Sequence, residues 1–91
     1  MAPPGDTSQP RFAAGCRWGG SETERMVLIP EGAIRVEGTG RRILEACDGE
    51  RTFLDIVAEL QANYSASDPA KIRKDVGDFL EGLQQKRIID Y

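Results

Sequence analysis

The sequence predicts an α+β fold, a small winged-helix-like domain in which a three-stranded antiparallel sheet is followed by three helices. Two observations support this prediction. Short apolar segments separated by turns rich in glycine and proline fill residues 11–37, which is typical of strands. From residue 39 onward, apolar residues recur at intervals of three and four, which is the period of a helix. A chain of 91 residues has room for one modest core, so we expect a single domain over residues 11–91.

The first ten residues differ in composition from the rest of the chain. Residues 1–10, MAPPGDTSQP, combine proline, glycine and polar side chains without an apolar run. Such a segment buries too little apolar surface to offset the entropy that its ordering would cost. We therefore predict a disordered tail over residues 1–10. The same segment has no apolar stretch of the kind that a secretory signal requires.

Three strands are expected in the first half of the chain. The segments RFAAGCRW (11–18) and ERMVLIP (24–30) flank a glycine-rich loop, which predicts a β-hairpin. Pro30 has no N–H to donate to a ladder, so it ends the second strand. The third strand, AIRVE (33–37), alternates apolar and polar residues. This alternation predicts one buried face and one face in water.

Two short helices joined by a tight break follow the strands. Thr39 is expected to cap the first of them, and Gly49 to end it in the left-handed conformation. Thr52 then begins the second helix, with Asp55 three positions later in a capping-box arrangement. The buried stripe expected on the second helix consists of Phe53, Ile56, Val57 and Leu60.

The third helix has the clearest start signal in the chain. Asp68 is a favourable N-cap, and Pro69 occupies the first helical position, where its missing N–H has no cost. The expected buried stripe consists of Ile72, Val76, Phe79, Leu80 and Leu83. The last residues, 87–91 (RIIDY), are expected to return against the core as a short extended segment.

The side chains that usually carry catalysis or bind metals are scarce. Histidine is absent, and the two cysteines, Cys16 and Cys47, are too few for a zinc site or an iron–sulfur cluster. The carboxylates are spread along the helices and do not converge. We therefore expect no enzyme activity, no cofactor and two free thiols that serve as packing residues. No apolar run approaches membrane-spanning length, so we expect a cytoplasmic protein without a membrane partner.

Two helices joined by a tight turn, residues 41–60, are also the start of a DNA-binding helix-turn-helix. A small winged-helix DNA-binding regulator is therefore the alternative function. Against it, the net charge is −3 and the pI is about 4.9, whereas proteins that contact phosphate usually have a basic excess. The third helix carries three basic residues in its first turns, Lys71, Arg73 and Lys74. These residues either face solvent or line a groove for an acidic or polar peptide.

Two further features favour a peptide as the partner. A three-stranded sheet in so short a chain has unpaired edges, and an edge is a template for another strand. Gly77 lies in the middle of the third helix, where it costs about 1 kcal/mol relative to alanine. It either lets helix and sheet pack closely or leaves room for a guest chain. The free edge also permits pairing with a second copy, which would give a homodimer.

Three stretches of the chain together resemble the PqqD family, which acts in the biosynthesis of the redox cofactor pyrroloquinoline quinone. They are RW (17–18), LIPEGAIRVEGTGRRILEACDGERT (28–52) and DVGDFLEGL (75–83), and the resemblance extends over residues 11–89. It implies a peptide chaperone of the RiPP recognition element type. Such a protein binds the precursor peptide PqqA and presents it to PqqE. PqqE is a radical SAM enzyme that crosslinks a Glu and a Tyr of the peptide, and it would hold the clusters and SAM itself.

The resemblance also implies a site, in which the peptide adds a strand beside the third strand and rests against the third helix. Carried onto this chain, the residues are Ala33, Ile34, Arg35 and Val36 on the strand and Ile72, Arg73, Val76, Gly77 and Leu80 on the helix. The chain departs from the family pattern in two places. Family members commonly have Leu-Asn where this chain has Val36-Glu37, and Gly where it has Arg87. The first departure leaves a carboxylate at the end of the docking strand.

Overall fold

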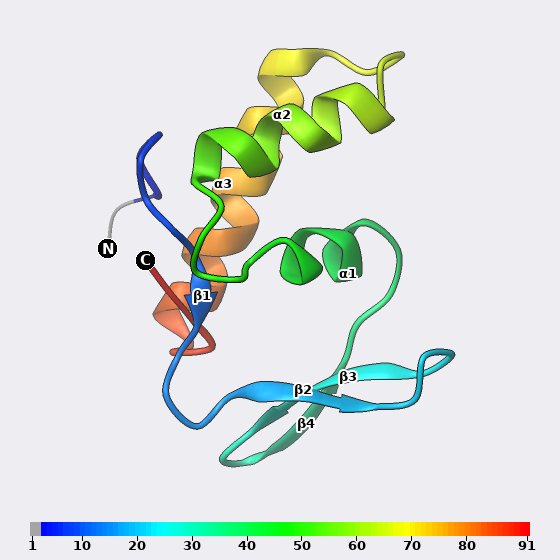
Figure 1. The fold of residues 1–91 in the computed structure, drawn as a ribbon, viewed down its shortest axis with the longest axis vertical. Helices are drawn as coiled ribbons and strands as arrows, with labels where there is room; N and C mark the ends of the chain where they lie inside the picture. Colours follow the sequence, from blue (N-terminus) through cyan, green and yellow to red (C-terminus); the bar gives the residue numbers. More distant parts are fainter. Residues whose placement is uncertain (1–2) are drawn as a thin grey trace.

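A computed structural model of the chain describes residues 3–91 and contains two small antiparallel sheets and three helices (Figure 1). In chain order the elements are β1 (Arg11–Phe12), β2 (Arg17–Gly20), β3 (Arg25–Ile29), β4 (Gly32–Arg35), α1 (Gly38–Glu45), α2 (Phe53–Asn63), α3 (Pro69–Gln85) and β5 (Ile89–Asp90). The predicted α+β class, with a three-stranded antiparallel sheet before three helices, is confirmed.

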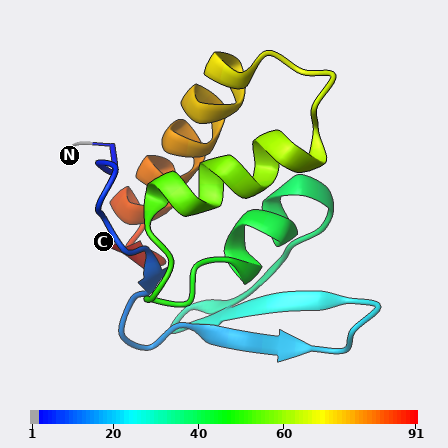
Figure 2. The same cartoon turned by 45° about the horizontal axis from the view of Figure 1, so that its top comes forward.

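The larger sheet has the order β2-β3-β4. In its register Trp18 lies opposite Val27, and Val27 lies opposite Ile34, so these three residues form one row across the sheet. Pro30 follows β3 directly and begins the turn into β4, as its missing N–H predicts. Figure 2 shows α1 lying between this sheet and α2. The helices therefore cover one face of the sheet.

The strand expected over residues 11–18 is divided in two. Cys16 donates a backbone hydrogen bond to the carbonyl of Ala13 (3.0 Å), and Gly15 adopts the left-handed conformation (φ +86°), so the chain turns between β1 and β2. As a result β1 leaves the larger sheet and pairs with β5, with Arg11 opposite Asp90. The short extended segment predicted at the end of the chain is confirmed as β5.

The ends of α1 differ from those predicted. The residue that precedes α1 is Glu37, whose side chain makes no capping hydrogen bond, and Thr39 already lies within the helix. The prediction that Thr39 caps α1 is therefore wrong. The helix ends at Glu45, before Gly49 is reached. Gly49 is left-handed (φ +81°), but its N–H donates to the carbonyl of Pro10 (3.0 Å) and does not close the helix.

The predicted starts of α2 and α3 are confirmed. The amide of Asp55 donates to the Thr52 hydroxyl (3.1 Å), and the amide of Thr52 donates to the Asp55 carboxylate (3.0 Å). These two hydrogen bonds form a capping box. The hydrogen bond from the Thr52 amide, with a further contribution from the Thr52 hydroxyl, holds the pKa of the Asp55 carboxyl below its usual range. At α3 the amide of Ala70 donates to the Asp68 carboxylate (3.0 Å), and Pro69 is the first helical residue.

The N-terminal segment, for which the composition predicts a disordered tail, lies against α2 in the structure. Residues 1 and 2 lie outside the described residues, but residues 3–10 make defined contacts with the start of α2. The amide of Phe53 donates to the carbonyl of Ser8 (2.7 Å), and the amide of Leu54 donates to the carbonyl of Asp6 (3.2 Å). The first turn of a helix leaves its amides without partners inside the helix. The N-terminal segment supplies acceptors for two of them.

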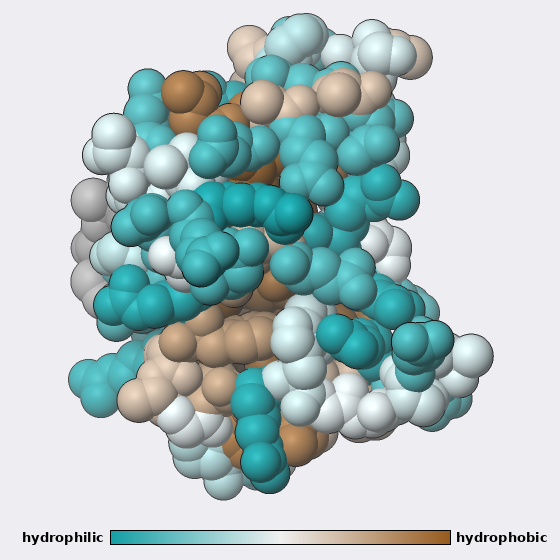
Figure 3. Space-filling view, viewed as in Figure 1, coloured by the Kyte–Doolittle hydropathy of each residue, from teal (hydrophilic) through white to brown (hydrophobic). Residues whose placement is uncertain are grey.

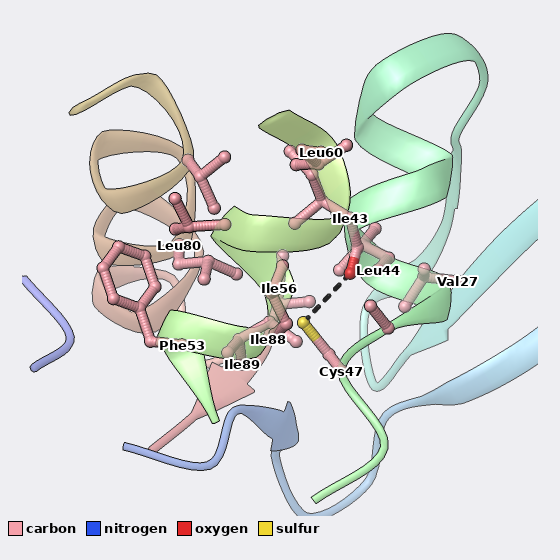
Figure 4. Packing of buried hydrophobic residues seen from close by; sticks show 13 residues of the cluster. Val27, Ile43, Leu44, Cys47, Phe53, Ile56, Leu60, Leu80, Ile88 and Ile89 are labelled. Atoms are coloured by element: carbon pink, nitrogen blue, oxygen red, sulfur yellow. Dashed lines mark hydrogen bonds between the residues drawn. The ribbon is translucent and has the colours of Figure 1, made fainter. Parts of the chain in front are cut away.

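The hydrophobic core lies between the three helices and is closed by the two sheets (Figure 4). Its buried members are Val27, Ile43, Leu44, Ala46, Cys47, Phe53, Ile56, Val57, Leu60, Val76, Leu80, Ile88 and Ile89. The whole stripe predicted for α2 is buried, which confirms it. On α3 only Val76 and Leu80 of the predicted stripe are buried, and the other three members are partly exposed.

The Cys47 thiol belongs to this core. It donates a hydrogen bond to the carbonyl of Ile43 (3.3 Å), drawn as the dashed line in Figure 4. Burial, with a smaller contribution from the neighbouring Asp48 carboxylate, raises the pKa of the thiol to about 12. Because the reactive form of cysteine is the thiolate, Cys47 is inert near neutral pH and serves as a packing residue.

Hydrophilic residues dominate the helical part of the face in Figure 3, while more hydrophobic residues gather below it, around the start of the larger sheet. Within residues 3–91, no helix combines the length and the apolar character needed to cross a membrane.

Leu80 is completely buried, which makes it a direct test of the core. We expect Leu80→Ala to lower the free energy of unfolding by about 2–5 kcal/mol, because the truncated side chain leaves a cavity at the centre of the core. Chemical denaturation followed by circular dichroism measures this change. The matched control is Leu54→Ala on α2, where the leucine is 49% exposed and the change should stay within about 0.5 kcal/mol. Equal effects of the two substitutions would contradict the described packing.

Candidate functional site

One edge of the larger sheet carries outward-pointing backbone groups. β4 pairs with β3 on one side, and within residues 3–91 no strand pairs with its other side. The amide of Val36 donates to the carbonyl of Arg25 on β3 (3.2 Å). Because residues alternate along an antiparallel ladder, Ile34 also directs its backbone groups toward β3. The amides and carbonyls of Ala33 and Arg35 therefore point away from the sheet.

The side chains of β4 alternate between the two faces of the sheet. Ile34 lies opposite the buried Val27, so it points toward the helices, and Val36 packs against the core in the same way. Arg35 projects from the opposite face, where its guanidinium lies 3.6 Å from the carboxylate of Glu24. The open edge therefore has an apolar side that faces α3 and a charged side that faces water.

A groove of about 290 Å³ lies between β4, α1 and α3, and we call it the edge groove. Its apolar lining consists of Val27, Ile34, Val36, Gly40, Leu44, Phe79 and Leu83. The outward backbone of β4 adjoins this lining, and the groove also includes Arg35 and Glu37. An extended segment paired to β4 would therefore place every second side chain against an apolar surface.

Of the α3 residues that the sequence proposes for the site, some lie near the edge groove and others do not. Ile72 and Val76 line a cavity that shares Gly40 and Phe79 with the edge groove. These two residues therefore lie on the same side of α3 as the groove. Residues three and four positions apart share one face of a helix. Phe79 and Leu83 continue the face that Ile72 and Val76 begin. The sequence places both in the buried stripe and so misses them as site residues.

Arg73, Gly77 and Leu80 do not line the edge groove. The Arg73 guanidinium pairs with Asp6 and lies 5.2 Å from the centre of the Phe53 ring. A Cβ placed on Gly77 would meet the same ring at 3.6 Å. Leu80 is completely buried in the core. Gly77 therefore faces α2 and not the sheet, and together with Arg73 it lines a separate cavity beside the N-terminal segment.

The basic residues of α3 are paired with carboxylates. Lys71 lies 3.3 Å from Asp75, and Lys74 lies 2.7 Å from Asp78, each one helical turn away. Arg73 pairs with the N-terminal segment, as described above. The hydrogen bond to Asp78 raises the pKa of Lys74. The first turns of α3 therefore present a locally neutral surface, which offers little attraction for a phosphate backbone.

Comparison with known proteins agrees with this geometry. The family model for coenzyme PQQ synthesis protein D (PqqD) matches residues 24–89. The chain belongs to the PqqD family. Two relatives carry the name PqqA binding protein. The protein from Stutzerimonas stutzeri is 36% identical over 77 residues, 82% of each chain, and the one from Kluyvera intermedia is 35% identical over 86 residues, 91% of each chain.

Two solved structures share the fold. The PqqD part of Methylobacterium extorquens PqqCD is described as a functional, stand-alone RiPP recognition element. It has 30% sequence identity and a TM-score of 0.70, and the match covers 93% of this chain and 95% of that one. TbiB1, solved in complex with the TbiA(beta) leader peptide, has a TM-score of 0.75 over 88% of this chain and 94% of that one. Its sequence identity is 22%, so this similarity shows the fold alone.

The resemblance to PqqD that the sequence carries is thus confirmed. As a PqqD protein, the chain is not an enzyme. The family match begins at residue 24 and therefore includes β4, α1 and α3, which form the edge groove.

Gly77→Ala tests the position of Gly77 on α3. A methyl group there meets Phe53 at an ordinary contact distance, so we expect the higher helix propensity of alanine to raise the free energy of unfolding by about 0.5–1 kcal/mol. The matched control is Gly82→Ala in the same helix, where a Cβ would have nothing within 4 Å. Urea denaturation compares the two variants. A loss of stability in Gly77→Ala alone would mean that α2 and α3 pack more closely than described.

Proposed function

We propose that this chain is a non-catalytic peptide chaperone of pyrroloquinoline quinone biosynthesis. It binds the precursor peptide PqqA as an additional strand on β4 and presents it to the radical SAM enzyme PqqE. The observation that carries this proposal is the open backbone edge of β4 beside the apolar edge groove.

Strand addition uses two parts of the site for different purposes. The amides and carbonyls of Ala33 and Arg35 pair with the backbone of the peptide, which gives affinity with little dependence on its sequence. Alternate side chains of the peptide then enter the edge groove over Ile34 and Val36 from the strand, and over Phe79 from α3. These side-chain contacts supply the selectivity.

The relatives support the identity of the peptide. Proteins 35–36% identical to this chain are named for binding PqqA, and the PqqD part of PqqCD is described as a recognition element for ribosomally made peptides. TbiB1, which has the same fold, was solved with a leader peptide bound. A precursor peptide is therefore the guest that agrees with both the family and the groove.

Presentation to PqqE requires no reactive group from this chain. The chaperone holds the peptide extended and raises its local concentration at the enzyme. PqqE supplies the iron–sulfur clusters and the SAM with which it joins a Glu and a Tyr of the peptide. Of the helix residues that the sequence proposes, Ile72 and Val76 act from the groove side of α3. Arg73, Gly77 and Leu80 act indirectly, by holding α3 in place.

Two other partners compete with this proposal. A second copy could pair its own β4 with this edge, which would give a homodimer that hides the peptide site. Peptide binding would then weaken as the protein concentration rises. Duplex DNA is the less favoured partner, because the net charge is −3 and the basic residues at the start of α3 are paired. Binding to DNA that weakens steeply with salt would support it.

Arg35→Pro tests whether the backbone of β4 binds the peptide. Proline removes the outward amide but breaks no hydrogen bond to β3, so the sheet should remain intact. A carbonyl of the peptide then loses its donor, and we expect the affinity for PqqA to fall roughly 5- to 100-fold. Isothermal titration calorimetry with synthetic PqqA measures the loss.

The matched control is Arg35→Ala, which removes the same side chain but keeps the amide. We expect it to lose much less affinity than Arg35→Pro, because Arg35 only borders the edge groove and its guanidinium lies beside Glu24 on the face away from the helices. Equal losses in the two variants would assign binding to the guanidinium and would contradict strand addition. Full affinity in both would place the peptide elsewhere on the protein.

Presentation to PqqE has its own readout. We expect the chain to increase the yield of crosslinked PqqA formed by reduced PqqE with SAM, as measured by mass spectrometry. Arg35→Pro should give little increase, and Arg35→Ala a nearly full one. If PqqA binds tightly but the yield does not change, the chain binds the peptide without presenting it.

A further inference from the structure

A second cavity, of about 360 Å³, lies between α1, α2 and the first half of α3. We call it the helix pocket and define it by Ile43, Leu60, Tyr64, Ile72, Val76 and Phe79. Ile43, Leu60 and Val76 are almost completely buried and form its floor, whereas Ile72 is partly exposed at its side. Its volume falls within the range of about 300–1,000 Å³ that is usual for ligand pockets.

The rim of the helix pocket is polar, and it includes charged groups. The hydroxyls of Thr39 and Tyr64 lie 3.3 Å apart, and the Arg42 guanidinium lies 5.9 Å from the centre of the Tyr64 ring. Asp75 is the charged residue in the lining, and Lys71 pairs with it at 3.3 Å. A cavity with an apolar floor and a hydroxyl rim suits a bulky aliphatic or aromatic side chain. A carboxylate would have to lose its water beside Asp75, which is unfavourable.

The helix pocket adjoins the edge groove. Both are lined by Gly40 of α1 and Phe79 of α3. A Cβ on Gly40 would lie 3.4 Å from the Phe79 ring, so the ring packs closely against this glycine and the two residues form a ridge between the cavities. A peptide that leaves β4 would therefore cross this ridge to reach the first half of α3.

The length of the two cavities along α3 suits a short peptide segment. At a rise of about 1.5 Å per residue, the stretch of α3 from Ile72 to Leu83 spans roughly 16 Å. An extended chain covers the same distance with about five residues, at about 3.3 Å each. A peptide paired to β4 thus needs only a few further residues to reach the helix pocket.

We propose that the helix pocket binds one bulky apolar side chain of the peptide, from a residue that lies outside the stretch paired to β4. This inference rests on the proposed function, because it takes the peptide on β4 as given. β4 runs toward Gly40 at its carboxyl end. A peptide antiparallel to β4 therefore places this residue on the amino-terminal side of its paired stretch.

Ile72→Trp tests the proposal by filling the helix pocket from its partly exposed side. We expect a roughly 10- to 100-fold loss of affinity for synthetic PqqA, because the peptide side chain no longer finds an apolar site. Ile72→Ala leaves the pocket open but removes part of its apolar lining, so it should weaken binding to a smaller extent. It replaces Ile72→Trp in the test if the tryptophan variant does not fold. The matched control is Leu54→Trp, at an exposed position of α2 that lines neither cavity.

A scan of the peptide completes the test. Each apolar residue of PqqA is replaced by alanine, and each variant peptide is titrated into the original chain and into Ile72→Trp. We expect one apolar position, outside the paired stretch, whose replacement costs roughly 10-fold or more with the original chain and almost nothing with Ile72→Trp. Full affinity of Ile72→Trp, or additive losses at every position, would overturn the helix pocket and leave strand addition intact. Failure of the original chain to bind PqqA would overturn both proposals.

Discussion

The packing of α3 against the core is the constraint on which the rest of the structure depends. Leu80 is completely buried and Val76 nearly so, and Gly77 lies over the Phe53 ring. These contacts fix the rotation of α3 about its own axis. Once that rotation is set, Phe79 and Leu83 must lie beside β4 with part of their surface uncovered. The edge groove is therefore a consequence of the core, since the apolar stripe of α3 is wider than the core can bury.

The open edge of β4 is a feature that most proteins suppress. An unpaired strand invites aggregation, and short length, charge or a covering segment usually limits that risk. Here β4 is four residues long, and Arg35 carries its charge on the face away from the helices. The short length and the charge limit aggregation at this edge but leave it unpaired. The outward amides and carbonyls remain available on the side where the groove selects what can pair.

The local signals at the starts of α2 and α3 predict the structure correctly, those at the two ends of α1 do not, and several contacts between distant segments have no signal in the sequence. Thr52 and Asp55 predict the start of α2, and Pro69 that of α3, because a cap involves neighbours in the chain. β1 depends on β5, and the N-terminal segment depends on the first amides of α2. Neither contact leaves a local pattern. For the site, the edge of β4 follows from counting strands, but the division of α3 between core and groove depends on tertiary packing, which helical spacing alone does not determine.

The division of labour within the site explains why a protein without catalytic groups can still be specific. A backbone edge accepts almost any extended chain, because every residue but proline offers the same amide and carbonyl. Discrimination must then come from side chains, and the basic groups of α3 are already paired with carboxylates of the same helix or of the N-terminal segment. What remains is apolar shape, along the edge groove and into the helix pocket. In the proposed mode of binding, a guest would be selected by the positions of its bulky apolar residues along an extended backbone, and less by its charge.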